Sequence, residues 1–184
     1  MLARSDVRFT VVLDDPSFTF NASHFLTFPI ENDKGATVWA AEPIHGHDFK
    51  VSVRIEGPLD ESGCVVDFLA ASRALRKITG SWNHDLALAR TARGVSYATN
   101  GDKTRVLYEV APKLEYVFPT NAIRWLDASN VSTEEIAYQL LDEFTRELDA
   151  LGVLAYDIDA YTVTLRLEES PHCAVEVSTR GPAA

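Results

Sequence analysis

The 184-residue chain has little of what marks secreted or membrane-spanning proteins. It contains two cysteines, Cys64 and Cys173, which lie far apart and predict buried, reduced thiols rather than a disulfide framework. No apolar run approaches the length of a membrane span, and the N-terminal residues contain no apolar segment of the secretory type. We therefore expect a cytoplasmic protein.

Basic residues are also scarce, with 17 Lys and Arg against 27 Asp and Glu and a formal net charge of −10. Nucleic acids and anionic membranes are bound by basic surfaces, so we expect neither as a partner. The hydrophobic fraction of 46% and the charged fraction of 24% are those of an ordinary globular protein. A chain of this length is expected to form one domain, residues 1–184.

Histidine is infrequent, but three of the five histidines, His24, His45 and His47, fall in the first 47 residues. Apolar and polar residues alternate strictly over 49–56, which predicts a half-buried strand. Alternate residues of a strand share a face, so His45 and His47 are expected to point the same way. Gly46 between them permits the close approach of another segment.

Two imidazoles on one face supply two of the three protein ligands that a catalytic zinc ion needs. His24, just past a candidate first strand, could supply the third as a neutral imidazole. The alternative is that His45-Gly46-His47 is a turn at the entry to the strand and that its histidines lie on the surface. The position of His24 favours a zinc site.

Periodicity and capping signals predict an α+β fold, an antiparallel sheet with two helices packed on one face. Asp67 is expected to cap a helix that ends at Gly80, and Ser132 to cap a second that ends at Gly152. Between the helices, short strands are predicted near 105–108 and 114–118. The other expected strands are 8–13, continued by 18–20, then 47–56, 161–169 and 172–177.

Six short motifs in one order resemble the family of 6-pyruvoyltetrahydropterin synthase and 6-carboxytetrahydropterin synthase. They are Phe20-x-Ala-x-His24, His45-Gly46-His47, Val66-Asp67-Phe68, Asn83-His84-x-Leu86, Ser132-x-Glu134-x-Ile136-Ala137 and Glu169-Ser170-Pro171. The resemblance implies a T-fold (tunnelling fold) with a four-stranded antiparallel sheet, a pterin substrate and zinc on His24, His45 and His47. It also implies a homo-oligomer, a hexamer built as a dimer of trimers. Because family members are shorter between the two helices, the resemblance implies that residues 87–130 are an insertion.

Three residues are candidates for substrate binding. Glu169 continues the apolar face of its strand, where a carboxylate needs a hydrogen-bonding partner. Two N–H donors on one edge of a pterin ring would provide it, and the resemblance implies the same role for Glu169. The alternative is that the strand ends at Leu167 and Glu169 is solvated. Ser132 and Glu134 are assigned to substrate binding by the resemblance alone.

The catalytic candidates depart from the family pattern. The resemblance implies an Asp-His pair, but Asn83 stands in place of the aspartate before His84, the expected acid. A surface histidine is the alternative. The usual cysteine before the His-x-His motif is absent, and Glu42 stands three residues before His45. The alternative for Glu42 is a solvated surface glutamate before a proline turn.

This Glu-x-x-His-Gly-His arrangement resembles a branch of the family in which glutamate replaces the cysteine. The resemblance implies a zinc-dependent lyase that converts 7,8-dihydroneopterin triphosphate into 6-hydroxymethyl-7,8-dihydropterin. The alternatives within the family are a 6-carboxy-5,6,7,8-tetrahydropterin synthase on the queuosine route and a 6-pyruvoyltetrahydropterin synthase. An alternative of another class is a non-catalytic homologue that binds zinc and pterin.

Overall fold

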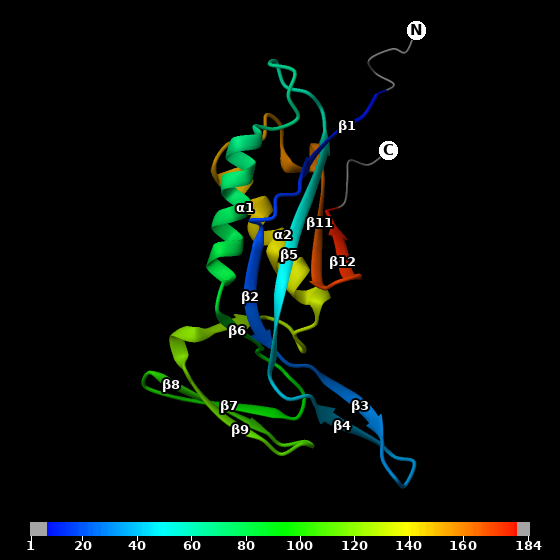
Figure 1. Ribbon diagram of the computed structural model, residues 1–184, viewed down its shortest axis with the longest axis vertical. Coiled ribbons are helices and arrows are strands. Elements are labelled where there is room, and N and C mark those ends of the chain that lie inside the picture. Colours follow the sequence, from blue (N-terminus) through cyan, green and yellow to red (C-terminus); the bar gives the residue numbers. More distant parts are fainter. Residues whose placement is uncertain (1–6, 180–184) are drawn as a thin grey trace. The chain divides into compact units, whose positions relative to one another are not determined.

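The computed structural model of the protein describes residues 7–179 (Figure 1). The N-terminal residues 1–6, on which the expectation about a secretory signal rests, lie outside the described part. The chain divides into two compact units, the first with residues up to Phe20, Phe49–Ser81 and residues from Ile136 on, the second with Asn21–Asp48 and Trp82–Glu135. Strands β2 (Thr19–His24) and β5 (His45–Gly57) each belong partly to both units.

The first unit contains four antiparallel strands (Figure 1). Both β1 (Phe9–Leu13) and β11 (Thr162–Ser170) pair with β5, and β12 (Cys173–Ser178) pairs with β11. On β5 and β11 one face is apolar and at most 2% exposed, comprising Phe49, Val51, Val53, Ile55, Val163, Leu165 and Leu167. The intervening residues are polar and reach solvent, which confirms the predicted alternation. The expectation of a sheet with four strands is wrong, because these strands belong to a sheet of seven.

Two helices bury their apolar stripes in the first unit, α1 (Phe68–Trp82) and α2 (Thr133–Ala150). Asp67 caps α1 as predicted, because its Oδ1 accepts the backbone N–H of Leu69 at 2.8 Å and of Ala70 at 3.2 Å. The prediction that Gly80 ends this helix is wrong. The helix continues to Trp82, whose fully buried side chain anchors the last turn.

The second helix begins as expected, since Ser132 Oγ accepts the backbone N–H of Glu135 at 3.4 Å. Its buried residues recur at helical spacing and are Ile136, Ala137, Leu140, Leu141, Phe144 and Leu148. The helix ends at Ala150, slightly before the predicted Gly152, and Leu151, which follows it, is 52% exposed. The stripes of both helices and the apolar face of the strands form the core of this unit.

The second unit contains three sets of strands, most of which the sequence analysis did not predict. The end of β2 pairs in parallel with β6 (Asp85–Ala89), which pairs in parallel with β10 (Ile123–Leu126). The fold is therefore α+β with a mixed sheet. The hairpin of β3 (Thr27–Glu31) and β4 (Thr37–Ala41) was also missed. An antiparallel three-stranded sheet consists of β7 (Val95–Asn100), β8 (Lys103–Tyr108) and β9 (Glu115–Pro119).

The predicted strands near 105–108 and 114–118 correspond to β8 and β9. Gly101 forms the turn between β7 and β8 with φ of +61°, a conformation that glycine adopts without strain. A buried cluster joins β8 of this sheet to β6, to β4 and to the residue that follows His24; its members are Phe25, Ala41, Leu86, Leu88, Val106 and Tyr108. The 87–130 region is therefore an integral part of the core of its unit.

The two cysteines differ from expectation in one respect. Both Cys64 and Cys173 are free, as predicted, but both are exposed rather than buried. Each lies next to a tight turn, Asp60–Gly63 for Cys64 and Pro171–His172 for Cys173, so neither side chain enters a core. Among the described residues, no helix is long and apolar enough to cross a membrane.

The first unit makes a testable prediction at Gly57, where an added Cβ would overlap the ring of the fully buried Tyr161. Gly57→Ala is expected to lower the free energy of unfolding by about 2 kcal/mol, because a packed ring must move. In the control Gly80→Ala, the new Cβ meets no atom within 4 Å. Higher helix propensity should raise the stability of this control by about 0.5–1 kcal/mol. Urea unfolding measures both, and wild-type stability of Gly57→Ala would contradict the packing argument.

Candidate metal centre and active site

The three predicted histidines converge in the second unit. His24 is the last residue of β2, and His45 and His47 lie at the start of β5. One ring nitrogen of each lies within 4.8 Å of those of the other two. The ring centroids of His24 and His45 are 4.7 Å apart, and those of His45 and His47 are 4.9 Å apart. The two β5 histidines therefore share a face, as strand geometry predicts.

Gly46 brings the two strands into contact at this point. A Cβ on Gly46 would lie 3.1 Å from Ser23 Oγ and 3.2 Å from the carbonyl oxygen of Ala22. Any larger residue would push β2 away from β5, and with it His24. This confirms the close approach predicted from the glycine between the histidines.

Hydrogen bonds to carbonyl groups set the chemical form of two of the rings. His24 Nδ1 lies 2.7 Å from the carbonyl oxygen of Val131, and His45 Nδ1 lies 3.1 Å from that of Pro43. A carbonyl only accepts, so each Nδ1 carries the proton and donates it. In a neutral imidazole the lone pair then lies on Nε2, which is the atom presented to a metal.

The residues present fit a zinc ion. Three neutral imidazoles leave one position of a tetrahedral zinc open, which is the arrangement of catalytic rather than structural sites. Ligand nitrogens at about 2.0–2.1 Å from zinc lie roughly 3.4 Å from one another. The observed separations, within 4.8 Å, need only small movements of the rings to reach this geometry. His24 is 1% exposed, so burial holds one of the three in place.

Glu42 lies between the β3–β4 hairpin and β5. Its Oε1 accepts the backbone N–H of Leu26 at 2.8 Å, and its own N–H donates to the carbonyl of Leu26 at 3.1 Å. Glu42 is half-buried, in contrast to the solvated surface glutamate of the alternative. Because Leu26 is two residues from His24, these bonds hold the carboxylate at the segment that carries a metal-ligand candidate.

His84 and Asn83 follow α1, and both are exposed. His84 has φ of +71°, which is uncommon outside glycine. Its N–H donates to the carbonyl of Asn21 at 2.6 Å, while Asn83 Oδ1 accepts the Asn21 N–H at 2.9 Å. The Asn83 side chain thus binds the backbone of β2.

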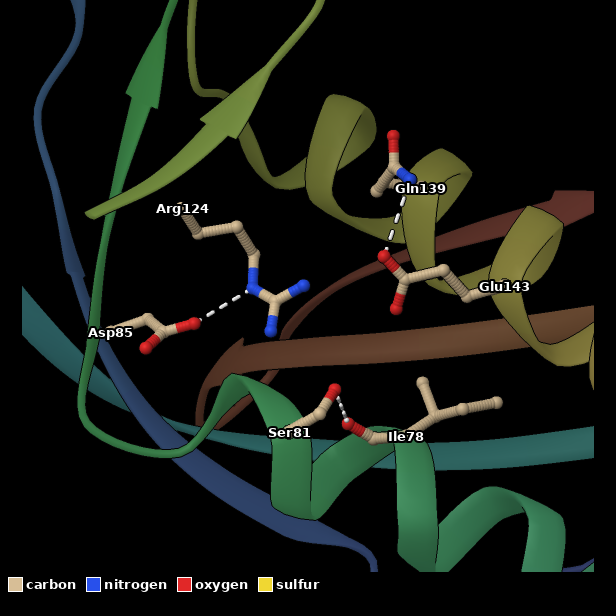
Figure 2. A network of polar contacts seen from close by, with 6 residues as sticks. All are labelled: Ile78, Ser81, Asp85, Arg124, Gln139 and Glu143. Atoms are coloured by element: carbon tan, nitrogen blue, oxygen red, sulfur yellow. Dashed lines mark hydrogen bonds and ion pairs between the residues drawn. The ribbon is translucent and has the colours of Figure 1, made fainter. Parts of the chain in front are cut away.

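The neighbouring carboxylate, Asp85, is engaged elsewhere. Its carboxylate accepts a hydrogen bond from Arg124 (Figure 2). The distance from Oδ2 to Nε of Arg124 is 2.8 Å, and both side chains are 23% exposed. The guanidinium of Arg124 also lies over the ring of Trp82, at 4.5 Å from the ring centroid. Asp85 is therefore held by Arg124, which the sequence analysis did not single out.

A pocket of about 280 Å³ adjoins the metal centre. Both His47 and His84 line it, with polar groups from β2, β5 and β6 around them. The complete lining is Asn21, Ala22, Ser23, Gly46, His47, Asp48, His84 and Asp85. A metal-ligand candidate and the expected acid thus face one cavity.

Tyr108 of β8 is buried beside this region, 1% exposed, and its ring packs against Phe25 at 4.8 Å between centroids. Burial raises the pKa of the Tyr108 hydroxyl well above its usual value, and the neighbouring Tyr116, Tyr97 and Glu42 add to the rise. Tyr108 is therefore neutral at physiological pH.

Comparison with known proteins decides the family. The sequence model of the 6-pyruvoyl tetrahydropterin synthase family matches residues 15–180, most of the chain. The chain belongs to this family. Among curated relatives, a Pyrococcus horikoshii protein whose name proposes a 6-carboxy-5,6,7,8-tetrahydropterin synthase is 29% identical over 119 residues. The match covers 64% of each chain, so it spans less than two thirds of that relative.

Solved structures of the tetrahydropterin synthase family share the fold. The crystal structure of 6-pyruvoyl tetrahydropterin synthase from Plasmodium vivax superposes with a TM-score of 0.77 at 24% identity, covering 95% of this chain and 99% of that one. The structure of the Plasmodium falciparum protein superposes with a TM-score of 0.74 at 23% identity, covering 94% of this chain and 98% of that one. These matches confirm the expected T-fold.

The substrate-binding candidates of this family member lie in different places. Ser132 is half-buried and caps α2, and Glu134 is exposed in the first turn of that helix. Glu169, in the first unit, is half-buried on β11. The pairing of β11 with β12 shifts register between Glu168 and Ser170, so Glu169 lies in a β-bulge. The bulge interrupts the alternation from which its orientation was predicted.

Sequence reasoning also missed Asn130, whose side chain bonds to the backbone of Thr27. The only local signal for Asn130 was that it directly precedes Val131 and the helix cap Ser132. The partner residue lies 103 positions earlier, and no local pattern indicates that contact.

Metal binding is testable by substitution. His24→Ala should weaken zinc binding by more than about 100-fold, beyond the effect typical of outer-shell partners, because one of three ligands is lost. The control is His172→Asn at an exposed turn with φ of +72°, a conformation asparagine tolerates. Competition with a chromophoric chelator measures the zinc affinity of both variants. Equal zinc affinity of His24→Ala and wild type would remove His24 from the site.

Proposed function

We propose that the protein is a zinc-dependent lyase that acts on the side chain of 7,8-dihydroneopterin triphosphate and yields 6-hydroxymethyl-7,8-dihydropterin. The observation that carries the proposal is the carboxylate of Glu42, which is bonded at 2.8 Å to Leu26, two residues after His24 of the three-histidine cluster. No cysteine occurs between His24 and His47, where the family usually has one. Glu42 is the ionisable side chain best placed to serve as the base.

His24, His45 and His47 would hold the zinc ion. When bound there, zinc polarises an oxygen of the substrate side chain as a Lewis acid. Glu42 accepts the proton of a side-chain hydroxyl while the adjacent carbon–carbon bond breaks. His84 donates a proton to the carbon that remains attached to the ring, and the triphosphate-bearing fragment leaves as an aldehyde. One proton is removed and one returned, so the reaction needs no oxidant or reductant.

Binding of the pterin ring is assigned to Glu169, whose carboxylate would accept two N–H groups of the ring together. Ser132 and Glu134 are proposed as further substrate-binding residues, with Asn83 as the neighbour that positions His84. The assembly proposed is a cytoplasmic homo-oligomer, a hexamer formed from two trimers.

Support for a glutamate base comes from the relatives. Two further structures of the P. vivax protein are of catalytic-residue variants, in which a glutamate is replaced by alanine or by cysteine. That family member therefore uses a glutamate catalytically. The glutamate before the His-Gly-His motif makes Glu42 the corresponding candidate in this chain.

Two alternatives have specific observations in their favour. The names of the archaeal relatives from Pyrococcus horikoshii and Archaeoglobus fulgidus favour a 6-carboxy-5,6,7,8-tetrahydropterin synthase. A 6-pyruvoyltetrahydropterin synthase is the other alternative within the family. Asn83 bonds to Asn21 and Asp85 bonds to Arg124, so both sequence neighbours of His84 are engaged with other residues, which favours a non-catalytic zinc- and pterin-binding protein.

Incubation of the zinc-loaded protein with 7,8-dihydroneopterin triphosphate, followed by mass spectrometry, separates these functions. The proposal predicts 6-hydroxymethyl-7,8-dihydropterin. A 6-carboxy or 6-pyruvoyl product would select the corresponding synthase. Pterin binding without turnover would select the non-catalytic alternative.

The role of Glu42 is tested by Glu42→Gln, which keeps the shape of the side chain and removes the base. It should lower kcat by about 10²–10⁴-fold, the range for a general base, with zinc content unchanged. Glu31→Gln, at the exposed end of β3, is the matched control and should retain full turnover. A fully active Glu42→Gln enzyme would exclude this residue as the base.

A further inference from the structure

One side-chain amide holds the segment that follows His24. Asn130 Oδ1 accepts the backbone N–H of Thr27 at 3.0 Å, and Asn130 Nδ2 donates to the carbonyl of the same residue at 2.9 Å. The amide thus pairs with both backbone groups of Thr27, as a neighbouring strand would. Thr27 is 2% exposed, so water does not readily replace these bonds.

The residue after Asn130 contacts the metal centre directly. The carbonyl oxygen of Val131 lies 2.7 Å from His24 Nδ1, and both residues are 1% exposed. The N–H of Val131 also donates to Asn130 Oδ1, at 3.3 Å. The position of the carbonyl that fixes the His24 tautomer is therefore tied to the position of the Asn130 side chain.

The same short segment is held from its other side by Glu42. Both backbone groups of Leu26 bond to Glu42, one through the carboxylate at 2.8 Å and one through the main chain at 3.1 Å. Leu26 and Thr27 are consecutive, so the two hydrogen bonds from Asn130 and the two from Glu42 anchor adjacent residues. Displacing Thr27 would move the partner of the Glu42 carboxylate as well.

We propose that Asn130 is a positioning residue of the metal centre. It keeps the Val131 carbonyl aligned with His24 Nδ1, so that His24 presents Nε2 to a divalent cation. It also keeps Leu26 in reach of the Glu42 carboxylate. The statement about Glu42 rests on the proposed function, whereas the statement about His24 concerns only metal binding.

Two substitutions test this proposal. Asn130→Asp keeps the acceptor for the Thr27 N–H but turns the donor into an oxygen that faces the Thr27 carbonyl. Asn130→Ala removes both bonds, and either folded variant suffices for the test. Asn32→Ala is the matched control, because Asn32 Oδ1 likewise accepts backbone N–H groups, from Lys34 and Ala36, in the β3–β4 turn.

Two readouts need no substrate. The first is the dissociation constant for zinc from chelator competition, expected to rise by about tenfold or more in both Asn130 variants, as for other outer-shell partners. The second is the tautomer of His24 in the metal-free protein, from long-range ¹H–¹⁵N NMR. It should be the Nδ1-protonated form in the wild type and in Asn32→Ala, and a mixture in the Asn130 variants.

Three results would overturn the proposal. They are zinc affinity within twofold of wild type in the Asn130 variants, weaker zinc binding with an unchanged His24 tautomer, and an equal loss in Asn32→Ala. Neither readout depends on the reaction catalysed. Failure of the proposed lyase activity would therefore leave this test intact, and failure of this test would leave the lyase proposal standing.

Discussion

The candidate site depends on the direction in which the imidazole of His24 is held. This ring is buried at the end of β2, where its Nδ1 proton is donated to the carbonyl of Val131. The opposite nitrogen then faces the two histidines of β5, which strand alternation places on one side. A ring free to flip or to exchange tautomers would offer a metal a donor N–H as often as a lone pair.

The strands that the sequence analysis took for an insertion build the surroundings of this ring. The N–H of Ala41, next to Glu42, donates to the carbonyl of Ala111 at 2.9 Å. Tyr108 packs with Phe25 and Ala41, which are the chain neighbours of His24 and Glu42 respectively. The β7–β9 sheet thus supports the histidines and the carboxylate together, which is a physical reason for its place in the fold.

The parts of the fold predicted from sequence are those with strong local periodicity. The alternation along β5 and β11 and the apolar stripe of α2 are local patterns, and the caps at Asp67 and Ser132 are local hydrogen bonds. The motif order identified the family for the same reason, because each motif is short and contiguous. Gly80 misled the prediction of the end of α1, where burial of Trp82 outweighs the low helix propensity of glycine.

The features that escaped prediction depend on contacts between distant residues. Strands β6 and β10 are short and pair in parallel, so no turn between them indicates the pairing. The Asn130–Thr27 and Arg124–Asp85 contacts span 103 and 39 positions. The bulge at Glu169 arises from the register of β11 against β12 and is not visible in the sequence of either strand.

The central claim is that three imidazoles bind one divalent ion. Zinc K-edge X-ray absorption of the zinc-reconstituted protein tests it most directly. The account predicts about three imidazole nitrogens at roughly 2.0–2.1 Å, with the multiple scattering typical of histidine and one further light ligand. Sulfur scattering at about 2.3 Å, or one zinc-bound imidazole per ion, would contradict it.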